Sequence, residues 1–293
     1  MTDLVKNEDS LEMLDEIDDQ SLDLIVTSPP YWAKREYRGS DPEGQIGLEA
    51  TPESYVTGLV GFFHKYGKKL KESGNLYVNI GDTFFGSGAG AWKKYANGQQ
   101  KGGDAPKETY IPEHPLQPKI KQNGKLYQNK QLLLIPARFA IAMQEDGWIL
   151  RDDIIWRKPN RIPSSVKDRM NNTYEHVYHF VKQGKYFFNL DPIKVEGKNG
   201  KLKNPGDVWD INTQPVKDGH HTATFPEELV QRIVLSSSPE GGVVNDPFLG
   251  TGTTWIVSSK CNRSFIGSEI SKEYYEIANK RFRGEIVNAE AGI

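Results

Sequence analysis

The fold is decided near the C-terminus, by the stretch Val243-Val244-Asn245-Asp246-Pro247-Phe248-Leu249-Gly250-Thr251-Gly252-Thr253-Thr254. A short apolar run, which predicts a buried strand, leads into a glycine turn and then into a helical pattern. Glycine tolerates positive φ and lets a ligand approach the backbone closely, while the start of a helix offers free N–H donors. The stretch therefore predicts a strand–turn–helix unit suited to binding a ligand.

The glycine turn alone leaves three interpretations open. A phosphate-binding P-loop needs a Lys after the last glycine, where Thr253 and Thr254 stand, and a dinucleotide fold needs a third glycine. A purely structural turn needs no ligand at all. Glu269 follows Gly250 by 19 residues, at the end of the next predicted strand. An acidic side chain at that place would hold the ribose hydroxyls of a nucleoside cofactor.

Predicted strands and helices alternate along the rest of the chain. Thr51 and Pro52 supply an N-cap and a first helical residue for one of these helices. The alternation predicts a doubly wound, largely parallel α/β sheet. Two irregular stretches, 83–130 and 159–222, are long enough to suggest binding functions. Strands are expected at 22–27, 75–80, 154–157, 178–181, 243–245 and 264–267, and helices at 52–71, 136–145, 226–236 and 272–282.

Composition restricts the class of protein. With 37% hydrophobic and 26% charged residues, the 293-residue chain can bury a core and is not a disordered polymer. The apolar run 132–135 is far too short to span a bilayer, and the acidic N-terminus has the wrong polarity for a signal peptide, so a cytoplasmic protein is expected. The single cysteine, Cys261, excludes a disulfide framework and a multi-cysteine zinc site, and no metal site is predicted.

The charge is distributed unevenly along the chain. The net charge is −2, yet residues 83–215 carry 21 Lys and Arg against 13 Asp and Glu. A basic middle on an acidic frame suits a protein that meets a polyanion with one face. Lysines clustered by chance in solvated loops are the alternative.

A second motif lies near the N-terminus, in Asp23-Leu24-Ile25-Val26-Thr27-Ser28-Pro29-Pro30-Tyr31-Trp32. Here a predicted strand ends in two prolines, which lack N–H donors. The Ser28 hydroxyl and the Pro29 carbonyl can therefore accept the two N–H bonds of a base amino group, whose delocalised lone pair makes it a poor nucleophile. Gripping both bonds would push the nitrogen toward a nucleophilic tetrahedral geometry. Tyr31 would stack on the base, flipped out of its duplex. A rigid proline turn is the structural alternative.

The two motifs resemble those of the S-adenosylmethionine-dependent DNA amino-methyltransferases. Ser-Pro-Pro-Tyr resembles their catalytic signature, and Asp-Pro-Phe-Leu-Gly-Thr-Gly resembles their cofactor motif. A first-position Ser resembles the cytosine-N4 group, whereas Asp or Asn is usual in the adenine-N6 group. Because the catalytic motif precedes the cofactor motif, the order resembles the circularly permuted β class. The resemblance implies a Rossmann-like methyltransferase sheet and S-adenosyl-L-methionine as cofactor.

The resemblance also assigns residues. The segment 7–10 resembles the acidic motif that contacts the cofactor's adenine, with Glu8 where a Gly usually stands, and 223–229 resembles the helix entrance that covers its methionine end. The implied catalytic residues are Ser28, Pro29, Pro30 and Tyr31. The implied cofactor-binding residues are Asp9, Phe225, Asp246, Phe248, Gly250, Gly252, Thr253 and Glu269. The implied DNA-binding residues are Arg157, Lys158, Arg161, Lys167 and Arg169, with Lys93 and Lys94 in the basic insert.

The predicted function is site-specific methylation of cytosine N4 in double-stranded DNA, on a host's nucleoid. The protein would be either the modification enzyme of a restriction–modification system, with a cognate restriction endonuclease as functional partner, or an orphan or phage methylase. Adenine-N6 methylation, methylation of RNA or a small molecule, and a non-catalytic DNA-binding module remain the alternatives. The predicted organisation is a catalytic half (1–82), a basic flexible insert (83–130), a continuation of the catalytic domain (131–158), a target-recognition region (159–222) and a cofactor-binding half (223–293).

Overall fold

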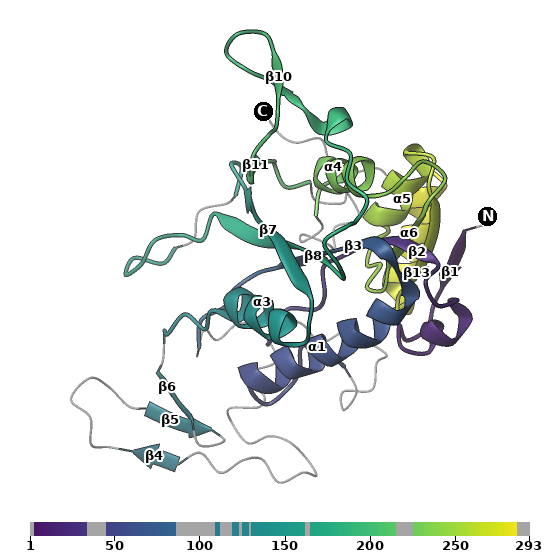
Figure 1. Ribbon diagram of the computed structural model, residues 1–293. Coiled ribbons are helices and arrows are strands. Elements are labelled where there is room, and N and C mark those ends of the chain that lie inside the picture. The colour runs from purple at the N-terminus through teal and green to yellow at the C-terminus, as the bar shows by residue number, and fades with distance from the viewer. Residues whose placement is uncertain are drawn as a thin grey trace.

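The computed structural model describes residues 3–33, 45–85, 109–111, 119–122, 125–128, 130–161, 165–214 and 225–285. Its centre is an eight-stranded sheet (Figure 1). In spatial order the strands are β1 (Leu4–Lys6), β13 (Ser264–Ser268), β12 (Val243–Asp246), β2 (Leu22–Thr27), β3 (Leu70–Ile80), β8 (Tyr174–Val181), β7 (Ile149–Arg157) and β11 (Val208–Asp210).

All strands of this sheet except β8 run in one direction, since β8 alone pairs antiparallel with both of its neighbours. The predicted largely parallel α/β sheet is thereby confirmed. Strand β2, from the N-terminal part of the chain, lies beside β12, from the C-terminal part, with Leu24 opposite Val244. Ligands of open α/β sheets bind at the carboxyl ends of the strands, where the strand order reverses. The pairing therefore brings the two sequence motifs to one edge of the sheet.

Helices cover both faces of the sheet (Figure 1). On one face α1 (Pro52–Lys69) and α3 (Ile135–Glu145) pack a core that includes Phe63, Tyr66 and Phe139. The other face carries α4 (Glu227–Ser237), α5 (Thr253–Lys260) and α6 (Lys272–Phe282), around Trp255 and Phe265. Burying both faces explains why the middle of β2, residues 24–26, is an unbroken apolar run whose residues are all buried.

The predicted start of α1 is confirmed in detail. Thr51 lies outside the helix with extended backbone, and its Oγ1 accepts a hydrogen bond from the Ser54 N–H at 3.1 Å. Pro52 occupies the first helical position, where its missing N–H costs nothing. These local signals fix where the helix begins, and the helix in turn places Phe62 under the cavity described below.

Several short elements were not predicted. The three-residue strands β1 and β11 are too short to show a periodic pattern. Within 83–130, where no regular structure was expected, β4 (Thr109–Ile111), β5 (Lys119–Gln122) and β6 (Lys125–Gln128) form an antiparallel sheet. The remaining pieces are η1 (Met13–Glu16), η2 (Asp191–Ile193) and the β9–β10 pair (Val195–Glu196 and Leu202–Lys203). Within the described ranges, no helix is long and apolar enough to cross a membrane.

Candidate active site

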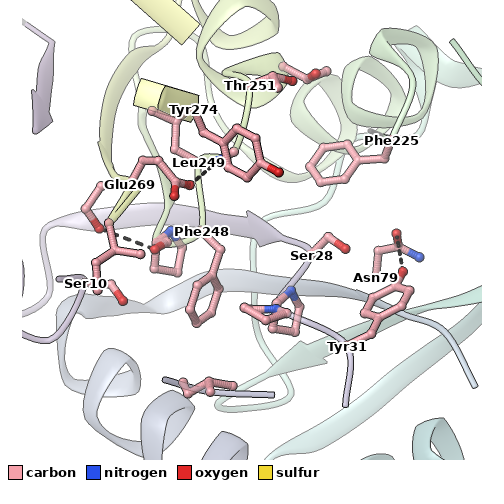
Figure 2. A pocket seen from close by; sticks show the side chains of 18 of the residues that line it. Ser10, Ser28, Tyr31, Asn79, Phe225, Phe248, Leu249, Thr251, Glu269 and Tyr274 are labelled. Atoms are coloured by element: carbon pink, nitrogen blue, oxygen red, sulfur yellow. Dashed lines mark hydrogen bonds between the residues drawn. The ribbon is translucent and has the colours of Figure 1, made fainter. Parts of the chain in front are cut away.

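A cavity of about 550 Å³ opens at the carboxyl edge of the sheet. Both sequence motifs line it, together with side chains from the strands between and beside them. Figure 2 shows Ser28 near the middle, with Phe248 and Glu269 toward one end and Tyr31 and Asn79 toward the other. The structure confirms the prediction that the two motifs meet in one crevice.

Glu269 dominates one end of the cavity. Its Oε2 accepts the Gly250 N–H and its Oε1 accepts the Ser271 N–H, each at 2.8 Å. The side chain is 7% exposed, and this burial raises the pKa of Glu269 to about 7. Each carboxylate oxygen keeps a further lone pair for a hydroxyl donor. Glu269 thus lies where a ribose could be held, at the end of β13 as its spacing predicted.

The same end combines aromatic rings with a second carboxylate. Phe248 stacks on Phe62 at 4.8 Å between ring centroids, and both rings line the cavity. Asp9 also lines it, with its Oδ1 accepting the Leu11 N–H at 2.7 Å. A flat apolar surface flanked by acceptors suits an adenine and a ribose, so the residues present fit the nucleoside part of S-adenosyl-L-methionine. Phe225 and Thr253 line the cavity as well.

Asp246 does not line the cavity but lies beneath the glycine loop. Its carboxylate accepts hydrogen bonds from Thr27 Oγ1 at 2.5 Å, Thr254 Oγ1 at 2.6 Å and the Phe248 N–H at 3.1 Å. It is 1% exposed, and burial raises its pKa to about 6. We correct its predicted role accordingly: Asp246 joins β2, the loop and α5, and it acts on a cofactor only through the loop.

Gly252 is likewise absent from the cavity wall. Its φ is +82°, and a Cβ added there would lie 2.9 Å from Ala278 Cβ on α6. Glycine is required here because α6 approaches the backbone closely, and not because a ligand does. Gly250, with φ of +55°, is the glycine of the pair that lines the cavity.

The tetrapeptide lies between the two ends of the cavity, and all four of its residues line it. The Pro30 carbonyl accepts the Tyr55 hydroxyl at 2.9 Å, whereas no donor among the described residues reaches the Pro29 carbonyl. The Pro29 carbonyl, which lines the cavity, can therefore accept a donor from a ligand.

Tyr31 is anchored through its hydroxyl. The hydroxyl lies 2.8 Å from Glu175 Oε2 and 3.2 Å from Asn79 Oδ1. Burial and the Glu175 carboxylate raise the pKa of Tyr31 well above its usual value. The phenol therefore stays protonated and donates to Glu175.

The predicted DNA-binding residues divide into groups. Lys158 lies inside the cavity with a side chain only 10% exposed, paired with Glu175, which does not suit an external phosphate. Arg161 lines the cavity. Arg157 is paired with Asp210 on β11. The others remain candidates or fall outside the structure: Arg169 lies 4.0 Å over the Phe84 ring, Lys167 is exposed, and Lys93 and Lys94 lie outside the described residues.

Sequence reasoning missed several residues of the cavity wall. Glu175 is the second residue of β8, the one reversed strand, so the start of that strand reaches the edge where parallel strands end. The available signal was a charged residue at the start of a strand. This signal points to the cavity only if the antiparallel direction of β8 is already known. The missed residues are Phe62, Asn79, Trp156, Glu175, Thr213 and Tyr274.

Both sequence motifs line one cavity, at the carboxyl edge of a largely parallel sheet with one reversed strand, as a methyltransferase of the resemblance described above requires. Comparison with known proteins agrees. The family model described as DNA methylase, of the N6 and N4 type, matches residues 22–280. The chain belongs to this family of S-adenosyl-L-methionine-dependent DNA methyltransferases.

Its relatives include type II methyltransferases. It is 38% identical to M.Cfr9I of Citrobacter freundii over 96% of this chain and 87% of that protein, and 38% identical to M.SmaI of Serratia marcescens over 93% and 88%. Among solved structures, PvuII DNA methyltransferase (cytosine-N4-specific) shares the fold with a TM-score of 0.68 and 21% identity, over 95% of this chain and 85% of that one. A putative DNA modification methylase from Thermus thermophilus, complexed with S-adenosyl-L-methionine, gives 0.60 at 22% identity, over 98% and 95%.

Proposed function

We propose that this protein methylates the exocyclic N4 of a flipped cytosine in duplex DNA, as the modification enzyme of a restriction–modification system. The observation that carries the proposal is the position of Ser28 in the cavity. It lies between the end that contains Glu269 and Phe248 and the polar end that contains Asn79 and Glu175. Its neutral hydroxyl supports cytosine over adenine by the resemblance described above. The names of its type II relatives support pairing with a restriction endonuclease.

The cofactor would be held by the acidic and aromatic end of the cavity. Glu269 accepts the ribose hydroxyls, Asp9 faces the adenine and Phe248 packs against its ring, while Phe225 covers the methionine end. When bound, the cofactor supplies a methyl group on a positively charged sulfur. A cofactor with its nucleoside at Glu269 would present that methyl group toward Ser28.

The tetrapeptide prepares the nucleophile. Ser28 Oγ and the Pro29 carbonyl accept the two N–H bonds of the amino group, which localises the lone pair on nitrogen. With the cofactor bound, that lone pair would take the methyl group from the sulfonium, and the methylated nitrogen would lose its extra proton to water. Ser28 and Pro29 would hold the amino group through both events.

The DNA would lie over the mouth of the cavity. We propose 159–222 as the target-recognition region and 83–130 as a basic insert, between a catalytic half (1–82 with 131–158) and a cofactor-binding half (223–293). Arg161 at the cavity, with Lys167 and Arg169 beyond it, would contact phosphates and base edges. Lys93 and Lys94 keep the same proposed role.

The test is chemical analysis of the product. The protein and its Ser28→Ala variant are expressed in a host that lacks DNA methylases, and the DNA is digested to nucleosides for mass spectrometry. N4-methylcytosine from the wild-type protein, strongly reduced with Ser28→Ala, is the expected result. N6-methyladenine would overturn the base assignment. Neither product, from a protein that binds the cofactor, would overturn DNA as the substrate.

A further inference from the structure

A buried ion pair lies at the end of the cavity opposite Glu269. Lys158 Nζ lies 2.5 Å from Glu175 Oε1, with side chains 10% and 16% exposed. Both residues line the cavity. Removing two charges from water costs about as much free energy as their attraction returns, so a buried ion pair adds little to stability. A functional role in the cavity would explain why this pair is there. The nucleoside end of the cavity does not use this pair.

The ammonium of Lys158 is held in place from two sides. It lies 4.0 Å over the Trp156 ring and against the Glu175 carboxylate. An ammonium carries three N–H donors. No further acceptor for them occurs among the residues that the structure describes. Lys158 therefore offers fixed, unused donors to whatever enters this end of the cavity.

A chain of contacts connects this ammonium to the catalytic tetrapeptide. The Tyr31 hydroxyl donates to Glu175 Oε2, and Glu175 Oε1 holds Lys158. Asn79 Nδ2 also donates to Glu175 Oε2, at 3.3 Å. The tetrapeptide, with its acceptors Ser28 and Pro29, and the donors of Lys158 thus line one cavity and are joined through Tyr31 and Glu175.

This order of acceptor and donor matches one base edge. On cytosine the amino group is followed by two acceptors, N3 and O2. On adenine the amino group is followed by one acceptor, N1, and then by a carbon-bound hydrogen. A flipped base is read through hydrogen bonds to this edge. Two donors beside the amino-group grip fit cytosine, and one of them would face a C–H group on adenine.

We propose that Lys158 is the specificity-determining residue for the flipped base, donating to its N3 and O2, and that Glu175 is the positioning residue that holds Lys158 and Tyr31. The inference rests on the proposed function and deepens it. It also replaces the phosphate contact predicted for Lys158. The chemistry of the methyl transfer stays with Ser28 and Pro29.

The experiment pairs a variant with a base analogue. Once the methylated position is mapped, duplexes carry either cytosine or 3-deazacytosine there; the analogue replaces N3 by C–H and keeps the amino group. Easier flipping of the analogue affects every variant alike, so the quantity of interest is kcat/KM for cytosine over that for the analogue. Loss of a hydrogen bond to a charged donor predicts that the ratio is about tenfold or more higher for the wild-type protein than for a variant without the donor.

Lys158→Met should lower the ratio by about tenfold or more relative to the wild-type protein, because the variant has no donor to lose. Glu175→Gln should lower it partway, since the ammonium is then less firmly held, and it serves as the second variant if Lys158→Met fails to bind S-adenosyl-L-methionine. Lys182→Met is the matched control. Lys182 pairs with Glu72 at the other end of β8, away from the cavity, so its ratio should equal that of the wild-type protein.

The outcomes separate this inference from the proposed function. A ratio that stays at the wild-type value in both Lys158→Met and Glu175→Gln would overturn the role of Lys158 while N4-methylcytosine is still the product. A product other than N4-methylcytosine is detected earlier, in the nucleoside analysis, and overturns the function on which the inference depends. Cofactor affinity within about twofold of wild type, measured by calorimetry, confirms that each variant is folded.

Discussion

Cofactor binding should depend on pH through Glu269. Its pKa is raised to about 7 by burial, and its two oxygens already accept N–H groups from Gly250 and Ser271. Only the ionised carboxylate can accept ribose hydroxyls on both remaining lone pairs. Protonation turns one oxygen into a donor and removes the charge that strengthens these bonds. Affinity for the nucleoside should therefore fall as pH falls through about 7.

The magnitude follows from the fraction of Glu269 that is ionised. With a pKa of about 7, roughly one molecule in eleven carries the carboxylate at pH 6 and about ten in eleven carry it at pH 8. If the ionised form binds, Kd should be about tenfold higher at pH 6 than at pH 8, a difference of about 1.4 kcal/mol. Binding at pH 6 should also release close to one proton for each ligand bound.

The assay is calorimetric titration with 5′-methylthioadenosine, which has the adenine and ribose of the cofactor but no titratable amino-acid group. Glu269→Gln is the control, because it keeps the size of the side chain and cannot titrate. It should bind more weakly at pH 8, by about tenfold or more, and its Kd should be flat between pH 6 and 8. A flat profile for the wild-type protein, or an equally steep one for Glu269→Gln, would refute the assignment of Glu269 to the ribose.

Four further predictions concern the loop, the tetrapeptide and the DNA. Asp246→Ala should lower Tm by about 5–10 °C, because three donors lose their acceptor, whereas the exposed Asp210→Ala should change it little; equal shifts would contradict the support role. Gly252→Val should lower both Tm and cofactor affinity by displacing α6, and a variant with normal Tm would disprove that packing; Gly61→Ala, in open space on α1, is the neutral control. Tyr31→Phe, which keeps the ring and loses the bond to Glu175, should lower kcat about tenfold with cofactor Kd unchanged; an unaltered kcat would show that the ring alone matters. DNA affinity, measured by fluorescence anisotropy, should fall steeply between 50 and 200 mM salt as phosphate contacts are screened, and a flat response would exclude a basic clamp.

Much of the fold could be predicted because its central strands carry strong local signals. The strand 22–27 is apolar and ends in two prolines, and β2 has these bounds. The expected strand at 75–80 begins earlier, at Leu70, because β3 continues through the polar residues 71–74. That extension depends on pairing with β2, in which Leu22 faces Leu70. A pairing of this kind has no local signature, so the sequence could not show it.

The candidate site was predictable only where one segment carries its own chemistry. Ser28 and Glu269 could be placed because each follows a predicted strand, and strand ends meet at one edge of a parallel sheet. The place of Lys158 could not be predicted in this way. It follows Trp156 and Arg157 and precedes Pro159, a context that favours an exposed basic loop. Its burial follows from β8, whose reversed direction sets Glu175 opposite Trp156.

The cofactor motif contains two kinds of residue that sequence resemblance cannot distinguish. Glu269 and Gly250 line the cavity, whereas Asp246 and Gly252 hold the loop that Gly250 belongs to. Changing a residue of the first kind should alter ligand affinity more than Tm. Glu269 also accepts two backbone N–H groups, so Glu269→Gln, which keeps an acceptor, is the variant that separates the two effects. Changing one of the second kind should alter both, because the loop and the helix behind it move together. The same reasoning applies to the other end of the cavity, where we propose that Lys158 contacts the base and Glu175 supports Lys158, so the base-analogue ratio is the measurement that separates a contact from its support.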